Sequence, residues 1–191
     1  MGKYVDPNIN AEVRGDLKIS KKMLKVACPS MFGLFGIKLT NFETYKRMCE
    51  YISLGDTQPA IVYNISPFLV AAYSDEMDAV VMVRFDESLI ERYNIVERQR
   101  MISVNIYTDG KSYGMDIPKD IKIGSGYLNR WTDFTPHIGD LLSNNIEIIQ
   151  NHKMNISEEK WHYVEQLAEE YAYNNPGIYR YGDKGLAVCN L

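Results

Sequence analysis

Two apolar runs in the middle of the chain constrain its fold more than any other feature. Residues 68–73 (FLVAAY) and 79–85 (AVVMVRF) are rich in β-branched and aromatic side chains and do not alternate with polar ones. A strand with one wet face alternates, so these runs indicate central strands that are covered on both faces. The short polar stretch between them predicts that they pair as a hairpin.

Further strands are predicted on either side of this hairpin. Residues 60–65 form another apolar run, and residues 101–107 alternate between apolar and polar side chains. The Asp109-Gly110 pair is typical of a tight turn, so we expect residues 112–117 to fold back as the partner of 101–107. Together these segments predict a largely antiparallel sheet of about five strands.

Apolar residues at helical spacing mark the segments that should cover this sheet. The spacing predicts helices over residues 41–54 and 157–173, with shorter ones over 17–27 and 86–93. A threonine followed by a proline at 135–136 has the order of an N-cap and a first helical residue, which predicts another helix there. The fold class is therefore α+β: a largely antiparallel sheet of about five strands flanked by three or more helices.

The length and composition favour one soluble domain. The chain has 191 residues, of which 46% are hydrophobic, enough for a substantial core, so we expect residues 1–191 to form a single globular domain. No apolar run approaches the roughly 18 residues of a membrane span, and the first residues lack the apolar stretch of a signal peptide. Cys28, Cys49 and Cys189 are odd in number and widely spaced, which is typical of reduced thiols. We expect a cytoplasmic protein that holds no cofactor.

An apolar segment with glycines follows the first predicted helix. Residues 30–39 place Gly33 and Gly36 among phenylalanine, leucine and isoleucine side chains. Glycines in such surroundings suggest close backbone packing or a bend rather than a flexible linker.

The charge of the chain bears on its partners. The net charge is −4, which repels phosphate backbones, so nucleic acid is not expected as a partner. Four lysines lie close together in the first predicted helix and could contact phosphate or an anionic membrane surface: Lys18, Lys21, Lys22 and Lys25. Such a run is usually a solvated face, so we expect no membrane partner either.

Two motifs suggest anion or cation binding, and neither is complete. Asp75, Glu76 and Asp78 are the densest carboxylate cluster, but they lack the glycine and distal glutamate of a calcium loop, so no metal site is predicted. Negative charge offered to a basic partner is the better interpretation of that turn. The Gly124-Ser125-Gly126 segment lacks the lysine of a phosphate-binding loop, which favours a plain turn.

His137 is the best candidate for catalysis. It lies near Asp133 and Asp140 in sequence, at the start of a predicted helix, where the helix dipole favours a neutral imidazole. A neutral imidazole beside a carboxylate can act as a general base. A small hydrolase that uses this His/Asp pair near the 124–140 loop is therefore our alternative hypothesis, although a histidine at a helix start is more often a surface or capping residue.

The first hypothesis is a non-enzymatic intracellular protein-binding module, for example an inhibitor or immunity-type protein that docks an acidic, aromatic-bearing surface on a protein partner. Aromatic side chains with polar tips are enriched at interfaces, and the predicted helix over 157–173 has an acidic arc. The residues assigned to this surface are Tyr127, Trp131, Phe134, Asp75, Glu76, Asp78, Glu165, Glu169 and Glu170.

Overall fold

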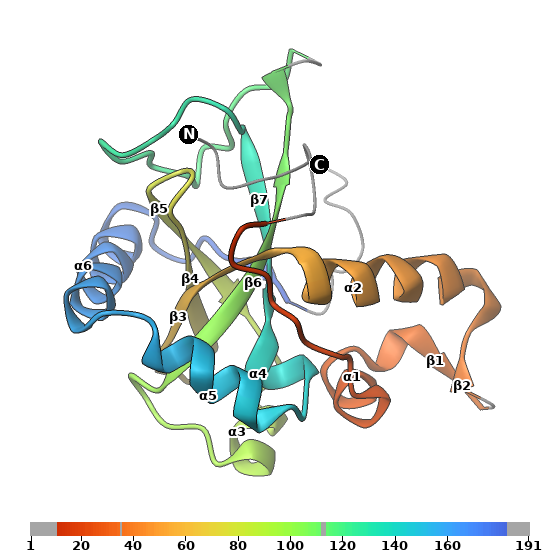
Figure 1. The fold of residues 1–191 in the computed structure, drawn as a ribbon. Coiled ribbons are helices and arrows are strands. Elements are labelled where there is room, and N and C mark those ends of the chain that lie inside the picture. Colours follow the sequence, from red (N-terminus) through yellow and green to blue (C-terminus); the bar gives the residue numbers. More distant parts are fainter. Residues whose placement is uncertain (1–10, 35, 112–113, 183–191) are drawn as a thin grey trace.

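One mixed sheet forms the centre of the fold. In the computed structural model, which describes residues 11–34, 36–111 and 114–182, its strand order is β7-β6-β3-β4-β5-β8 (Figure 1). The strands are β3 (Asp56–Ile65), β4 (Phe68–Ser74), β5 (Ala79–Arg84), β6 (Arg100–Thr108), β7 (Asp133–Ile138) and β8 (Arg180–Tyr181). All neighbours are antiparallel except β5 and β8, which are parallel. The predicted α+β class is confirmed: the sheet is largely antiparallel, and the parallel β5–β8 pair makes it mixed.

The hairpin of β4 and β5 forms as predicted, with Val70 opposite Val83 and Ala72 opposite Val81. Its two faces join different parts of the core. On one face Ala71, Tyr73, Val80 and Met82 pack with the longest helix, and on the other Val70, Ala72, Val81 and Val83 pack inside the curled sheet. Because both faces are covered, neither strand needs polar residues at alternate positions.

Most of the helices that contact the sheet pack on its outer face (Figure 1). The helices are α1 (Lys21–Ala27), α2 (Phe42–Leu54), α3 (Ser88–Tyr93), α4 (Gly139–Leu142), α5 (Ile146–Met154) and α6 (Glu158–Asn174). End signals are visible at two of them: Ser157 Oγ accepts from the Lys160 N–H at the start of α6, and Gly55 ends α2. A second, two-stranded sheet joins β1 (Phe32–Gly33) to β2 (Gly36–Ile37).

The prediction for the partner of β6 was wrong. Residues 114–117 form no strand, residues 112–113 lie outside the described part of the chain, and β6 pairs instead with β7. A long loop follows Asp109-Gly110 instead of a hairpin. Its two ends lie side by side, because the Gly110 N–H donates to Thr132 Oγ1 at 2.9 Å. A tight-turn sequence alone does not specify which later segment pairs.

The helix predicted at residues 135–136 begins later than expected. Thr135 and Pro136 belong to β7, and α4 starts only at Gly139. Proline cannot donate to a strand ladder, but β7 is an edge strand, where this loss is tolerated. The edge position therefore resolves the conflict between a helix-start signal and a strand.

The sheet curls so that its two edge strands are linked by one side chain. Arg180 of β8 donates to Asp120 Oδ2 at 2.8 Å, to Asp133 Oδ1 at 2.9 Å and to the Phe134 carbonyl at 2.8 Å. Burial by itself would lower the pKa of Arg180, but hydrogen bonds and charge from the two carboxylates raise it above its ordinary value. This ion cluster fixes β8 against the start of β7.

Other sequence expectations have simple outcomes. Among the described residues, no helix is long and apolar enough to cross a membrane. Cys28 is buried and Cys49 half-buried, and Cys189 lies outside the described residues. The described residues also contain no cluster of metal-ligating side chains.

Candidate partner-binding surface

The acidic turn between β4 and β5 faces inward. Glu76 and Asp78 are only 1% and 7% exposed, and Asp75 is half-buried. In this conformation the carboxylates of Glu76 and Asp78 cannot contact a partner directly. These two buried carboxylates can therefore affect the surface only indirectly, by positioning the groups that bond to the turn.

Asp78 is the acceptor that organises this turn. Its Oδ1 accepts hydrogen bonds from the hydroxyls of Tyr73 at 3.0 Å and Tyr163 at 2.9 Å, and its Oδ2 accepts from the Gly126 N–H at 2.9 Å. Burial by itself would raise the pKa of Asp78, but these hydrogen bonds and the charge of Lys160 lower it below its ordinary value. Asp78 is therefore a buried carboxylate that stays ionised near neutral pH.

The glycine-rich segment wraps around this same carboxylate. The Gly124 N–H donates to the Asp78 carbonyl at 3.0 Å, and a Cβ at Gly124 would lie 2.2 Å from Asp78 Oδ2. Only glycine allows so close an approach of one backbone to another. Of the N–H groups of this segment, that of Gly124 thus bonds to the main chain of Asp78 and that of Gly126 to its carboxylate.

Helix α6 is held on the sheet by the same turn. Tyr163 reaches Asp78 from the inner side of α6, and Lys160 Nζ donates to the Tyr73 hydroxyl at 3.0 Å. Burial, with the neighbouring Asp78 carboxylate, raises the pKa of Tyr73 well above its usual value. The apolar residues of α6 that pack on the sheet are Trp161, Val164, Ala168 and Tyr171. Polar and apolar contacts together fix the orientation of this helix.

The outward side of α6 presents carboxylates and one large aromatic ring, and we call it the acidic face of α6. Its residues are Glu158, Glu159, Glu165, Glu169, Glu170 and Tyr173. Tyr173 is 86% exposed, Glu169 and Glu170 are exposed, and Glu165 is half-buried. Two of the three α6 carboxylates that were predicted to bind a partner are therefore exposed.

Basic residues line the rim of this face. Arg100 forms a two-point ion pair with Glu158 at 2.5 and 2.7 Å, Arg98 lies 3.3 Å from Glu169, and Lys122 pairs with Glu170. Hydrogen bonds from Arg100 lower the pKa of Glu158. Exposed ion pairs like these contribute little to stability, so the carboxylates can exchange partners at small cost.

The predicted aromatic loop contributes mainly to the core. Trp131 and Phe134 are buried against Tyr107, with ring centroids 5.7 and 6.1 Å apart. Tyr127 is half-buried and donates its hydroxyl to the Trp131 carbonyl at 2.6 Å. In this conformation Trp131 and Phe134 support the loop from inside rather than forming a surface.

His137 lies buried on β7, away from solvent. Its ring stacks on Tyr51 of α2, with centroids 5.8 Å apart and planes at 24°, and its Nε2 makes no hydrogen bond within the described part of the chain. Burial lowers the pKa of His137 to about 4. The imidazole is therefore neutral at pH 7 and inaccessible to a substrate.

The two aspartates proposed to work with His137 bind other groups. Asp133 is held by Arg180, and burial raises its pKa although Arg180 opposes the rise. Asp140 Oδ1 accepts from Lys153 Nζ at 2.5 Å and its Oδ2 from the Ile102 N–H at 2.9 Å. The acid–base pair of the hydrolase hypothesis is not assembled in this conformation.

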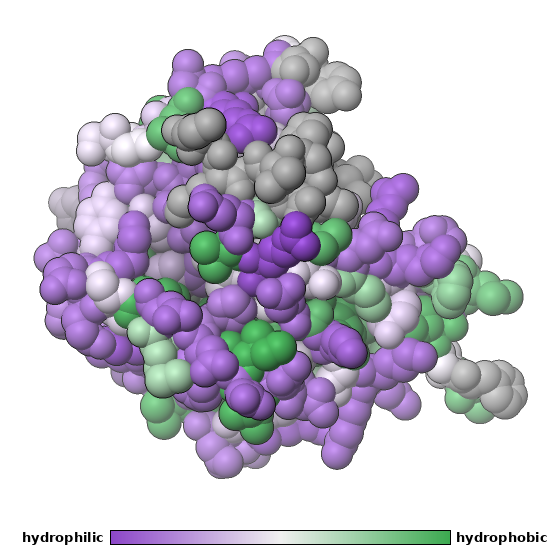
Figure 2. Space-filling model, viewed as in Figure 1, coloured by the Kyte–Doolittle hydropathy of each residue, from purple (hydrophilic) through white to green (hydrophobic). Residues whose placement is uncertain are grey.

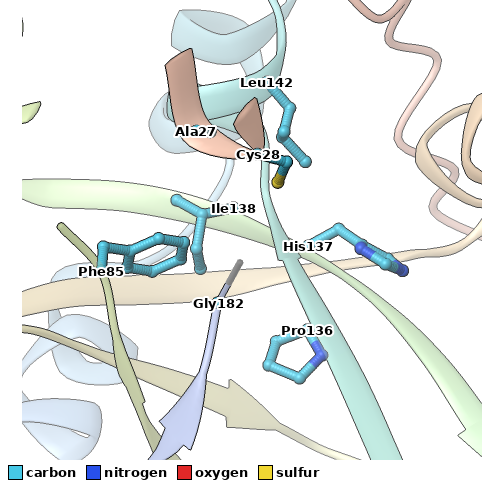
Figure 3. A pocket seen from close by; sticks show the side chains of 8 residues that line it. All are labelled: Ala27, Cys28, Phe85, Pro136, His137, Ile138, Leu142 and Gly182. Atoms are coloured by element: carbon cyan, nitrogen blue, oxygen red, sulfur yellow. The ribbon is translucent and has the colours of Figure 1, made fainter. Parts of the chain in front are cut away.

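A small cavity lies beside β7, and Figure 3 shows the side chains around it. Its volume is about 10 Å³, room for a single water molecule. It is lined by Ala27, Cys28, Phe85, Pro136, His137, Ile138, Leu142 and Gly182. The imidazole of His137 points away from Phe85 and Ile138 (Figure 3), so this cavity does not provide a substrate site for it.

A projecting segment that the sequence did not identify as a surface lies between α1 and α2. We call its described residues, 32–34 and 36–42, the arm; it extends from the body of the molecule (Figure 1). Leu34 is 97% exposed, Leu39 94% and Phe42 49%. Figure 2 shows apolar residues gathered at this end of the molecule. The close packing expected for residues 30–39 is not seen at the leucines.

Comparison with known proteins gives no match: no protein-family model, no curated protein and no solved structure is similar to this chain. The geometry of its surfaces therefore carries the functional argument. Two surfaces stand out, the acidic face of α6 and the arm.

Proposed function

We propose that this chain is a non-enzymatic protein-binding module that contacts its partner through the acidic face of α6. The observation that carries the proposal is Tyr173, 86% exposed at the end of a helix that displays five glutamates. A tyrosine buries a large area at small entropic cost and is a frequent anchor of interfaces. The carboxylates around it attract a basic partner and orient its approach.

Rigidity of the docking helix supports the proposal. Asp78 and Lys160 hold α6 against the sheet through hydrogen bonds to Tyr163 and Tyr73. The helix is therefore already ordered before a partner binds. A surface that is already ordered loses less conformational entropy on binding. The buried acidic turn thus contributes indirectly, as the support of the docking helix.

Among intracellular binding modules, an acidic helical face suits an inhibitor or immunity-type protein that occludes a basic surface of its target. Such a protein needs charge complementarity and a fixed shape rather than catalytic groups. The exposed ion pairs at the rim fit this role, because Arg98 and Lys122 can release Glu169 and Glu170 to a basic partner.

Affinity capture from lysate of the source cell, followed by native mass spectrometry, tests the proposal. We expect one stoichiometric protein companion with the wild-type chain, lost with Tyr173→Ala and with Glu169→Lys plus Glu170→Lys. The matched control is Glu91→Lys plus Glu97→Lys, which makes the same charge change at exposed positions outside α6. Circular dichroism melting checks that each variant is folded.

Two results would count against this function. A companion that binds the α6 variants as well as the control would exclude the acidic face of α6 as the contact surface. A chain that carries a bound small molecule and no protein would return weight to the hydrolase hypothesis and to His137.

A further inference from the structure

The arm exposes two of its apolar side chains almost completely. Leu34 and Leu39 are more than nine-tenths exposed, and Phe42 at the start of α2 is half exposed. These residues come from one continuous segment, which extends from the body of the molecule (Figure 1). Exposed apolar groups concentrated in this way mark a contact with another apolar phase.

Basic residues flank the arm on both sides. Residues 17–47 hold seven lysines or arginines and one glutamate, a net charge of +6. The rest of the chain, with 14 basic and 24 acidic residues, has a net charge of −10. The basic residues are Lys18, Lys21, Lys22, Lys25, Lys38, Lys46 and Arg47, all exposed. The charge of this surface therefore favours an anionic occupant.

Cations also lie directly beside aromatic rings at the base of the arm. Lys46 Nζ is 5.7 Å from the ring centroid of Phe42, and Lys21 Nζ is 5.6 Å from that of Tyr45. The Lys21 contact brings α1 against α2, so the lysines before and after the arm share one end of the molecule. Aromatic rings beside cations, next to bare leucines, are typical of the boundary between lipid headgroups and acyl chains.

We propose that the arm docks this protein on an anionic membrane surface, with Leu34 and Leu39 among the acyl chains and the flanking lysines at the phosphate level. A bilayer accepts a convex apolar projection without a matching groove, whereas a protein partner would need one. The sequence-based expectation of no membrane partner treated the lysine run as a solvated face, without the exposed leucines beside it, and a surface contact needs no spanning segment. The proposal is independent of the acidic face of α6.

Vesicle sedimentation with the full chain tests the proposal. The probes are vesicles of phosphatidylcholine alone and of equal parts phosphatidylcholine and phosphatidylglycerol. We expect binding to the second and little to the first, with binding that weakens as salt rises. Leu34→Ser plus Leu39→Ser should weaken binding about tenfold or more, because the inserted apolar area is lost.

Matched controls separate specific docking from general stickiness. Ile146→Ser plus Met154→Ser removes two other exposed apolar side chains, on α5, and should leave binding unchanged. Lys22→Glu plus Lys25→Glu should weaken binding about tenfold, whereas Arg92→Glu plus Lys119→Glu, the same charge change elsewhere, should have a much smaller effect.

The outcomes are decisive in both directions. No binding to phosphatidylglycerol vesicles, or equal losses in the α5 control and the arm variant, would overturn the proposal. Photo-cross-linking in source cells from a photoreactive residue in place of Leu34 adds a second measurement. Lipid adducts support the membrane contact, and an adduct with an acidic protein overturns it in favour of a protein partner for the arm.

Discussion

The turn between β4 and β5 and the arm between α1 and α2 differ in which side chains they expose to solvent. The turn buries the carboxylates of Glu76 and Asp78, and the arm exposes Leu34 and Leu39. Asp78 is buried because three donors converge on it, which replaces the hydrogen bonds it would make with water. At Asp78, hydrogen-bond donors from the protein therefore compensate for the burial of a charged side chain.

The largest effect should come from removing the buried acceptor. Asp78→Ala leaves the hydroxyls of Tyr73 and Tyr163 and the Gly126 N–H without their acceptor, and we expect a loss of about 4 kcal/mol in the free energy of unfolding. Urea denaturation measures it. Asp116→Ala, at an exposed carboxylate, is the control and should change stability by less than about 0.5 kcal/mol. A loss in Asp78→Ala no larger than in the control would show that the turn is not held by Asp78.

His137 is a buried polar group of a second kind, because its Nε2 has no hydrogen bond among the described residues. Its pKa is about 4 in the folded chain against 6.5 ordinarily, so the unfolded state binds more protons between these values. Stability should therefore fall by about 3 kcal/mol as pH falls from 7 to 4.

Urea denaturation across this pH range, compared between the wild-type chain and His137→Phe, checks this prediction. The free energy of unfolding of the variant should lose the part of its pH dependence that comes from the imidazole. Carboxylates that titrate in the same range are present in both proteins, so their contribution cancels in the comparison. Parallel pH profiles for the two proteins would mean that His137 is protonated without penalty in the folded state.

Paired glycine substitutions compare the two regions directly. A Cβ at Gly124 would lie 2.2 Å from Asp78 Oδ2, so Gly124→Ala should destabilise the fold by about 2 kcal/mol. A Cβ at Gly33 in the arm meets nothing closer than 3.6 Å, so Gly33→Ala should stay within about 0.5 kcal/mol of wild type. Thermal and urea unfolding report both. Equal effects at the two glycines would contradict the close approach at Asp78.

The smallest effect is expected in the arm itself. Leu34→Ser plus Leu39→Ser removes two side chains that are already in water, so the free energy of unfolding should change by less than about 0.5 kcal/mol. A clearly larger loss would show that the arm packs on the body in solution. If stability is unchanged, a loss of vesicle binding by the same variant can be assigned to the two leucines rather than to unfolding.

Local patterns in the sequence were sufficient to predict the central elements of the fold. The β4–β5 hairpin formed where two continuous apolar runs predicted it, and α2 and α6 formed where helical apolar spacing predicted them, because these signals are local. The pairing of β6 with β7 could not be predicted, since it depends on a partner beyond a long excursion. Pro136 was interpreted as a helix start because its edge position was unknown.

The candidate site was predictable only in part, and for a related reason. Glu169 and Glu170 lie on the outer arc of a helix whose period is visible in the sequence, and both are exposed. The burial of Asp78 depends on Tyr163, which is 85 positions away. The exposure of Leu34 follows from the lack of a covering element among the described residues, which no local pattern encodes. A charge count by segment was the signal that could have revealed the arm.

The cluster around Arg180 also bears on the order of events during synthesis. Arg180 follows Asp120 by 60 positions and Asp133 by 47, so the ribosome produces both carboxylates before the cation that joins them. At a synthesis rate of about 5–20 residues per second, several seconds pass between the synthesis of β7 and that of Arg180. During that interval two carboxylates without their cation lie beside an open strand edge, where like-charge repulsion discourages premature pairing with another nascent chain.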